Sequence, residues 1–163
     1  MWFLLNFNEI IFMQTLLDIQ LHNRKLFHRF LSQFTLEQLN TIPEGFNNNI
    51  VWNIAHSLVT QQLLMYKLSG LSLHIPQEWV GMFAKGTKPE RDLTADEVSA
   101  IDAALFSTHE EMIEDFKQGV FSDFKPYTTS TKMELNDIAA AQTFVLFHDG
   151  LHIGSVLALA KLV

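Results

Sequence analysis

Two histidines near the C-terminus have the spacing of a pair of metal ligands on one helix. His148 and His152 are four residues apart in the sequence His148-Asp-Gly-Leu-His152. Residues at i and i+4 of an α-helix lie about 40° apart around its axis and about 6 Å apart along it, so both imidazoles can reach one ion. Phe144 before the pair and Leu159 after it predict that this face is buried. The spacing alone leaves open the alternative of two buried or groove histidines that are satisfied by hydrogen bonds.

The same five residues resemble the His-Glu-x-x-His motif of zinc proteases, with Asp149 in place of the glutamate. Aspartate is one methylene shorter than the glutamate that acts as the base, and Gly150 is unusual in that motif. The chain ends at Val163, and none of the 11 residues after His152 is acidic or a histidine. A protease is therefore a disfavoured alternative. Asp149 lies about 100° around the helix from His148, so we expect it on the helix surface or behind the ligands rather than as a base.

A third ligand has to come from upstream of this pair. The upstream histidines are His22, His28, His56, His74 and His109. His56 lies well inside a helical pattern, where Trp52 and Val59 are its neighbours on the same face at i−4 and i+3. This predicts that His56 points inward from a helix that packs in the same bundle.

His109 is the main competitor for the third position. It comes one turn after Leu105 on the predicted third helix, but the adjacent Glu110 and Glu111 indicate the edge of the buried stripe. We interpret it first as a histidine at the edge of a helix, with contact to the site as the alternative. The other upstream histidines are expected in solvent or in a connection: His22, His28 and His74.

Helical periodicity predicts four substantial helices joined by two long connections. The helices are expected at about residues 7–34, 50–70, 94–119 and 136–162, with a short helix near 78–83 in the connection 71–93, and room for a short strand in the loop 120–133. The apolar face of the first helix is predicted to carry Phe12, Leu16, Ile19, Leu26 and Phe30. These elements indicate an all-α fold, a four-helix bundle with at least one long crossover connection.

Local signals mark where several of these helices begin and end. Thr35-Leu-Glu-Gln38 and Thr94-Ala-Asp-Glu97 both have the form of a capping box. The run Asn47 to Asn49 supplies an N-cap for the second helix. Gly70 and Gly119 are natural residues for helix C-termini.

The composition limits the class of protein and its partners. A chain of 163 residues is expected to form one domain over residues 1–163. With 48% apolar and only 18% charged residues, disorder is excluded as the default reading. Eleven basic and 18 acidic residues give a formal net charge of −7, which argues against nucleic acid as a partner. Cysteine is absent, so a metal site must use His, Asp or Glu, and a reactive thiol must come from a small molecule.

The N-terminus begins with the apolar run Met1-Trp-Phe-Leu-Leu but has the features of neither a signal peptide nor a membrane anchor. Asn6, Asn8 and Glu9 interrupt the run, and no Lys or Arg occurs before Arg24. No apolar stretch approaches the roughly 20 residues that span a membrane. We therefore expect a soluble, cytoplasmic protein with no membrane partner.

The two histidine-containing segments together resemble the DinB-like (DNA-damage-inducible) superfamily of four-helix bundles. The resemblance rests on Trp52-Asn-Ile-Ala-His56 and on His148-Asp-Gly-Leu-His-Ile-Gly154, and it extends over residues 35–163, including Gly86-Thr-Lys-Pro89. Members of that superfamily have one histidine on the second helix and a His-x-x-x-His-x-Gly signature on the fourth. They include bacillithiol-S-transferases, mycothiol-dependent maleylpyruvate isomerases and many proteins described as hydrolases.

The resemblance implies that His56, His148 and His152 hold one divalent ion, zinc or nickel, with open coordination positions. It also implies a homodimer and a low-molecular-weight thiol as co-substrate. Three neutral imidazoles preserve the charge of the ion, which can then lower the pKa of bound water or stabilise a thiolate. Candidate pocket residues are Trp52 and Phe144, with His109 as the alternative described above and the loop 71–93 as a wall.

Two classes of function follow from these expectations. The first is a metal-dependent enzyme of the thiol S-transferase or hydrolase type, acting on a small-molecule substrate. The second is a non-enzymatic dimeric bundle whose metal site is structural or vestigial. A structural site is normally closed by a fourth protein ligand, so the number of protein ligands distinguishes the two classes.

Overall fold

The computed structural model describes residues 7–163, so the expectation for the apolar run Met1–Leu5 lies outside the described residues. The elements in chain order are α1 (Phe7–Gln33), α2 (Leu36–Asn40), α3 (Ile50–Gln62), the π-helical turn η2 (Leu63–Lys67), α4 (Gln77–Phe83), α5 (Ala95–Gln118), β1 (Tyr127–Thr128), β2 (Glu134–Leu135) and α6 (Ile138–Leu159). The predicted helices are therefore present, including the short one in the connection after η2.

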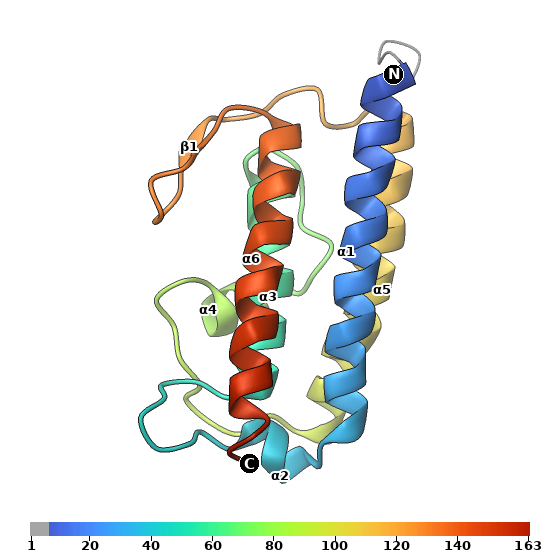
Figure 1. The fold of residues 1–163 in the computed structure, drawn as a ribbon. Helices are drawn as coiled ribbons and strands as arrows, with labels where there is room; N and C mark the ends of the chain where they lie inside the picture. The colour runs from blue at the N-terminus through green and yellow to red at the C-terminus, as the bar shows by residue number, and fades with distance from the viewer. Residues whose placement is uncertain (1–6) are drawn as a thin grey trace.

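Four long helices lie side by side and form the body of the molecule (Figure 1). Helices α1 and α6 run in one direction, and α3 and α5 run in the opposite direction (Figure 1). Helix α6 packs against both α3 and α1, and α1 packs against α5. The segment between η2 and α5 returns along the length of the bundle and carries α4 against α3. The predicted all-α bundle with a long crossover connection is confirmed.

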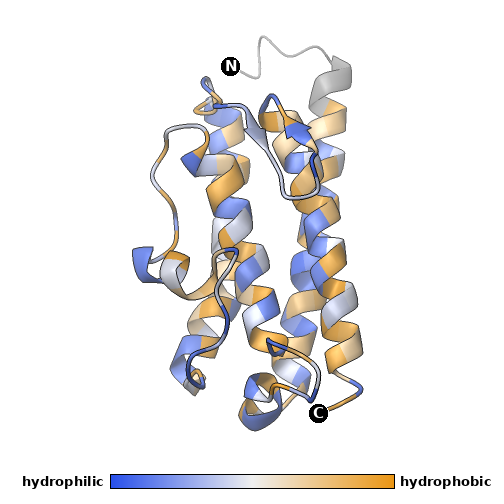
Figure 2. Cartoon of the chain, turned by 90° about the vertical axis from the view of Figure 1, so that its left-hand side faces the viewer, coloured by the Kyte–Doolittle hydropathy of each residue, from blue (hydrophilic) through white to orange (hydrophobic). Residues whose placement is uncertain are grey.

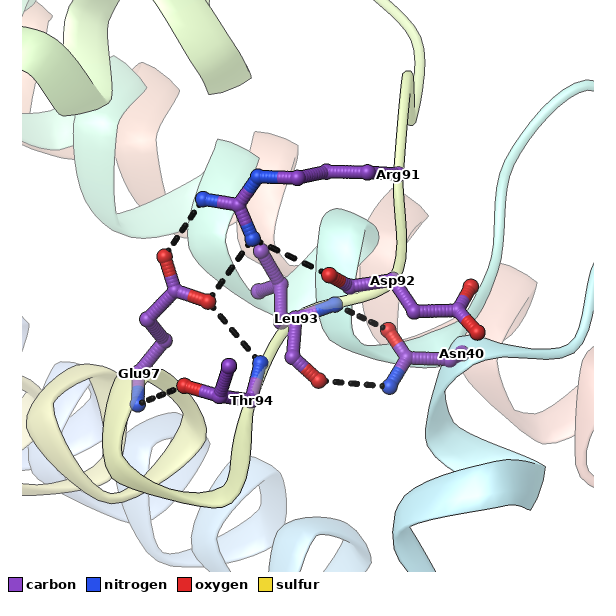
Figure 3. A network of polar contacts seen from close by, with 6 residues as sticks. All are labelled: Asn40, Arg91, Asp92, Leu93, Thr94 and Glu97. Atoms are coloured by element: carbon purple, nitrogen blue, oxygen red, sulfur yellow. Dashed lines mark hydrogen bonds and ion pairs between the residues drawn. The ribbon is translucent and has the colours of Figure 1, made fainter.

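The start of α5 is held by a network that also ties the crossover connection to α2 (Figure 3). Thr94 and Glu97 form the predicted capping box. Arg91 forms an ion pair with Glu97 at 2.6 Å. The side-chain amide of Asn40 bonds both backbone groups of Leu93, accepting from its N–H at 2.8 Å and donating to its carbonyl at 2.9 Å. The buried amide therefore replaces the backbone partner that Leu93 lacks in this irregular segment.

The other helix termini follow local sequence signals. Asn49 accepts a hydrogen bond from the Trp52 N–H and begins α3, and Asp137 does the same for α6 through Ala140. Gly119 ends α5 in the left-handed region, with φ of 69°, where a residue with a Cβ is disfavoured. After α3, the helix continues into η2, and π-helical turns of this kind are frequent at functional sites.

The interior is divided into two apolar clusters with a polar layer between them. The lower cluster lies toward the C-terminal ends of α1 and α6 and includes Phe27, Ile54 and Leu105. The upper cluster lies toward the N-terminal ends of these two helices and includes Leu17, Met65 and Met112. The buried polar side chains at intermediate height come from all four long helices: Gln20, Asn23 and Arg24 on α1, His56, Ser57 and Gln61 on α3, Thr108 and His109 on α5, and Asp149 on α6. The histidines that could do chemistry therefore lie at the level of this layer.

The face of α1 that packs inward differs from the predicted one. Phe12 and Ile19 were expected in the core, but they are 52% and 44% exposed, whereas Gln20 and Arg24 are buried. The helix itself was predicted correctly, and the error lies in its rotation. Hydrophobic and hydrophilic residues are interspersed along the helices (Figure 2). On α1, apolar side chains occur on both the buried and the exposed side, such as Leu17 and Phe12, so the periodicity does not select one face.

The loop after α5 contains a small antiparallel hairpin. Tyr127 pairs with Leu135 and Thr128 with Glu134. Leu135 is fully buried and anchors the hairpin on the upper apolar cluster. The loop that had room for a short strand therefore contains two, and this hairpin lies beside the start of α6 (Figure 1). Of the helices in the described part of the chain, none is both long enough and apolar enough to cross a membrane.

Candidate metal centre

Three imidazole rings from two neighbouring helices meet at one point. His56 comes from α3, and His148 and His152 come from successive turns of α6. One ring nitrogen of each lies within 4.8 Å of the others. The ring centroids are 5.1 Å apart for His56 and His148, 4.7 Å for His56 and His152, and 4.5 Å for the α6 pair. In the described part of the chain, no carboxylate or further histidine joins this group.

Hydrogen bonds to two of the rings orient them for this arrangement. Nδ1 of His56 lies 2.5 Å from the carbonyl oxygen of Phe83, and Nδ1 of His152 lies 2.8 Å from Oδ1 of Asn53. The Asn53 amide is itself fixed, because its Nδ2 donates to the carbonyl of Asn49 at 2.8 Å. Both acceptors are oxygens, so each Nδ1 carries the proton and each Nε2 keeps its lone pair for another partner. Partners of this type typically stand behind metal-ligating histidines.

Burial keeps the three rings neutral. Burial, and to a smaller extent the nearby His56, lowers the pKa of His148 to about 4. Burial, and to a smaller extent His148 and His56, lowers the pKa of His152 to about 3. The pKa of His56 is lowered by burial as well, against the opposing effect of its bond to Phe83. Metal ions bind the neutral form of histidine, so the donor set fits a divalent ion at neutral pH.

Trp52 supports His56 from behind. Its ring is stacked on the imidazole, with centroids 4.7 Å apart and an angle of 7° between the planes. Its Nε1 donates to the carbonyl of Met82 at 3.2 Å, next to the Phe83 carbonyl that holds His56. The end of α4 is therefore fastened to the helix that carries His56. Trp52 lines a separate cavity of about 750 Å³ under the crossover connection, not the cavity next to the three rings.

A second cavity, of about 390 Å³, opens onto two of the three rings. His56 and His148 form part of its wall, and Phe144 lines it as well, as proposed from the sequence. Thr60 also lines it, with its hydroxyl oxygen 3.4 Å from Nε2 of His56. Sequence reasoning missed Thr60, although its position four residues after His56 was a signal for it. Lys85 also lines this cavity and lies within the loop 71–93 that was expected to form a wall, whereas the hairpin residues had no comparable local signal.

Asp149 is completely buried, which corrects the expectation that placed it on the helix surface as one alternative. Ser57 donates a hydrogen bond to Oδ1, and Asn23 donates to Oδ2 at 3.5 Å. Burial raises the pKa of Asp149, and the charge of Arg24 and these hydrogen bonds oppose the rise. Asp149 thus lies behind His148 and joins α6 to α3 and α1.

His109 is not part of the site. It is 4% exposed, and its Nδ1 lies 2.9 Å from Oε1 of Gln20 in the polar layer. His109 is therefore not among the three converging histidines, and it is more deeply buried than a position at the edge of the buried stripe suggested. The flanking glutamates suggested an edge because the helix turns them outward. Of the other histidines, His22 is exposed, His28 pairs with Asp102, and His74 pairs with Glu111 and Asp115.

Comparison with solved structures and family models agrees with this fold. A conserved protein from Enterococcus faecalis has a similar structure, with a TM-score of 0.64 and 16% sequence identity, over 92% of this chain and 95% of that chain. At this identity the likeness concerns the fold alone. No curated protein matches the sequence. The model of the DinB superfamily matches residues 21–156, which include all three converging histidines. The chain therefore belongs to the DinB superfamily.

Proposed function

We propose that His56, His148 and His152 bind one divalent metal ion, zinc or nickel, and that the protein is a metal-dependent enzyme. The observation that carries the proposal is the geometry of three neutral imidazoles that converge beside an open cavity without a fourth ligand in the described residues. Structural zinc sites are normally closed by four protein ligands, and catalytic sites have three. The proposal is also supported by membership of a superfamily whose members bind metals.

The reaction we propose is transfer of a small thiol to an electrophile, or hydrolysis of a small-molecule substrate. An ion bound by three neutral ligands supplies Lewis acidity, which lowers the pKa of a thiol or of water. The chain has no cysteine, so the thiol is a co-substrate. Asn53 and the Phe83 carbonyl orient the rings, Thr60 offers a hydroxyl at the cavity wall, and Phe144 adds apolar surface to that wall.

The composition of the ligand sphere can be tested by metal analysis after dialysis. His152→Ala should abolish retention of zinc, because it removes one of three converging donors. His22→Ala and His74→Ala are matched controls, since these histidines are not in the group. Equal loss of metal from all the variants would contradict the assignment.

The two classes of function can be separated with cobalt-substituted protein. The visible spectrum of cobalt(II) responds when sulfur enters its coordination sphere, so an added thiol should change the spectrum in wild-type protein and not in a His148→Ala variant. Metal-dependent hydrolysis of esters or amides without a thiol response would favour the hydrolase. If the ion has four protein ligands, ignores thiols and supports no turnover, the protein is a non-enzymatic bundle with a structural metal.

We also propose that the protein is a cytoplasmic homodimer. The absence of cysteine is consistent with a reducing compartment. The outward sides of α1 and α6 expose large apolar side chains, among them Phe12, Ile19, Phe147 and Leu151, each at least 44% exposed. Helices α1 and α6 are neighbours in the bundle, and exposed apolar patches of this kind often mark interfaces.

A further inference from the structure

Four separate segments of the chain form the wall of the cavity beside the histidine rings. Thr60 and the π-helical turn η2 provide one side, Lys85 after α4 provides another, and the β1–β2 hairpin and α6 complete the wall. Its volume of about 390 Å³ is within the range of small-molecule sites. A ligand in this cavity would therefore contact elements that lie far apart in the sequence.

The charges around this cavity are all of one sign. Lys67 in η2 and Lys85 line it, and its lining residues include no aspartate or glutamate. Neither lysine forms an ion pair with another described residue. This local excess of positive charge occurs in a protein whose formal net charge is −7, so it differs in sign from the rest of the molecule. A cavity with low-dielectric walls and charges of one sign concentrates ligands of the opposite charge.

The remaining wall of the cavity is mixed. Leu64, Leu68 and Phe144 form apolar surface. Thr129 and Ser130 add hydroxyl groups from the hairpin. This combination suits a molecule with an apolar body and one charged group, because each part has a matching wall.

We infer that the ligand of this cavity is a small anionic molecule whose carboxylate or phosphate group is bound by Lys67 and Lys85, with its apolar part against Phe144. This inference deepens the proposed function, because it names the class of molecule that reaches the metal site. The two lysines determine specificity, since they bind the anionic group at the cavity wall while the three histidines hold the metal.

The first test uses metal-free, full-length protein and a pair of fluorescent dyes. The anionic probe is 8-anilinonaphthalene-1-sulfonate, and its neutral counterpart is N-phenyl-1-naphthylamine. Lys67→Met and Lys85→Met keep the apolar stem of the lysine and should each weaken binding of the anionic dye roughly 5- to 10-fold, the loss of one charge-assisted contact. Binding of the neutral dye should stay unchanged.

Lys88→Met is the matched control, because Lys88 is exposed and lines the other cavity. It should bind both dyes as wild type does. Displacement of the anionic dye by inorganic phosphate or by succinate then distinguishes a phosphate ligand from a carboxylate ligand. Equal binding of the anionic dye by wild type, Lys67→Met and Lys85→Met would overturn the inference, and so would parallel loss of both dyes.

The second test separates this inference from the proposed function. Cobalt-substituted protein is titrated with 3-mercaptopropionate and with its uncharged analogue 3-mercaptopropan-1-ol. Tighter binding of the carboxylate, lost in both lysine variants, supports the inference. Equal spectral responses to both thiols would overturn it and leave thiol transfer standing. If neither thiol changes the spectrum but the anionic dye still depends on the two lysines, thiol transfer fails and the anionic ligand is supported.

Discussion

Asn53 is the side chain that most directly controls the orientation of His152, one of the three proposed metal ligands. Its Oδ1 accepts from Nδ1 of His152 at 2.8 Å, and its Nδ2 is held by the carbonyl of Asn49. Partners of this type fix the tautomer and the ring orientation of a metal ligand. Asn53 lies on α3, whereas His152 lies on α6, so the orientation of the ring depends on the contact between the two helices.

Asn53→Ala should weaken zinc binding about 10- to 100-fold, the usual effect of removing such a partner. Competition with a chromophoric chelator measures the change. Asn53→Asp keeps an acceptor oxygen and should restore most of the affinity, whereas Asn47→Ala, at an exposed position, should have no effect. Affinity in Asn53→Ala within threefold of wild type would contradict the proposed role of this hydrogen bond.

His109 predicts a pH dependence of stability that does not involve the metal centre. Burial, and to a smaller extent the charge of Arg24, lowers the pKa of His109 to about 4, against an opposing effect of Asp18. In the unfolded chain its pKa is near 6.5, so the unfolded state binds a proton first as the pH falls. The stability that neutral His109 contributes is therefore complete above about pH 6.5 and is lost as the pH falls toward 4.

Metal-free wild type should lose roughly 1–3 kcal/mol more stability between pH 6.5 and 4 than a His109→Gln variant does. Glutamine cannot titrate but can still donate to Gln20. Urea unfolding at several pH values measures the free energy of unfolding of both proteins. Comparing how this free energy changes with pH removes any effect of the substitution that is the same at every pH. Parallel pH profiles for the two proteins would show that His109 does not titrate as the structure implies.

Helices α3 and α6 are joined behind the metal centre by the hydrogen bond from Ser57 to Asp149. Each of these residues is adjacent in sequence to a converging histidine, so the bond sets the relative position of the two helices at the site. Asp149 also receives Asn23 from α1, and the charge of the fully buried Arg24 lies nearby. A buried carboxylate that satisfies several donors is costly to remove, because they are left without a partner.

Asp149→Ala should lower the free energy of unfolding of the metal-free protein by about 3 kcal/mol. Asp149→Asn retains an acceptor for Ser57 and should cost less. Asp123→Ala, at an exposed loop position, should change stability by less than about 0.5 kcal/mol. A loss below about 1 kcal/mol for Asp149→Ala would mean that the buried network contributes little to the bundle.

The ends of the elements could be predicted from sequence because their causes are local. The capping boxes at Thr35 and Thr94 and the left-handed Gly119 depend on neighbours a few residues away. The inward face of α1 could not be predicted in the same way. Phe12 on its exposed side and Arg24 on its buried side reverse the usual pattern. The charge that acts on Arg24 is that of Asp149, which lies on another helix, so the sequence of α1 alone does not reveal it.

The candidate site shows the same division between local and long-range causes. His148 and His152 share a helix, so their spacing showed that both rings can reach one point, although it left open whether they do so as metal ligands. The position of His56 also followed from helical periodicity, although its role as a ligand stays a prediction together with theirs. Lys67 and Lys85 reach the cavity only through the bundle packing and the course of the crossover connection, and a sequence pattern does not contain that information.

At the scale of the whole molecule, the polar layer places the site between two apolar clusters. Buried polar groups contribute less to stability than apolar packing of the same volume. Arg24 has two nitrogens without a protein partner in the described structure, and Gln142 has both side-chain polar atoms in the same state. Buried water typically satisfies such groups. The two apolar clusters therefore provide the packing that allows a polar layer between them.

The exposed apolar face of α6 predicts how the molecule assembles. Phe147 and Leu151 lie one turn apart and are 52% and 51% exposed, so both would be buried if two copies pack through this face. Leu151→Glu places a charge in the middle of that contact and should convert a dimer to a monomer, because a buried unpaired charge is strongly unfavourable. Light scattering coupled to size-exclusion chromatography measures the mass. Ser99→Glu, exposed on α5, should leave the dimer intact, and a monomeric wild type would refute the predicted interface.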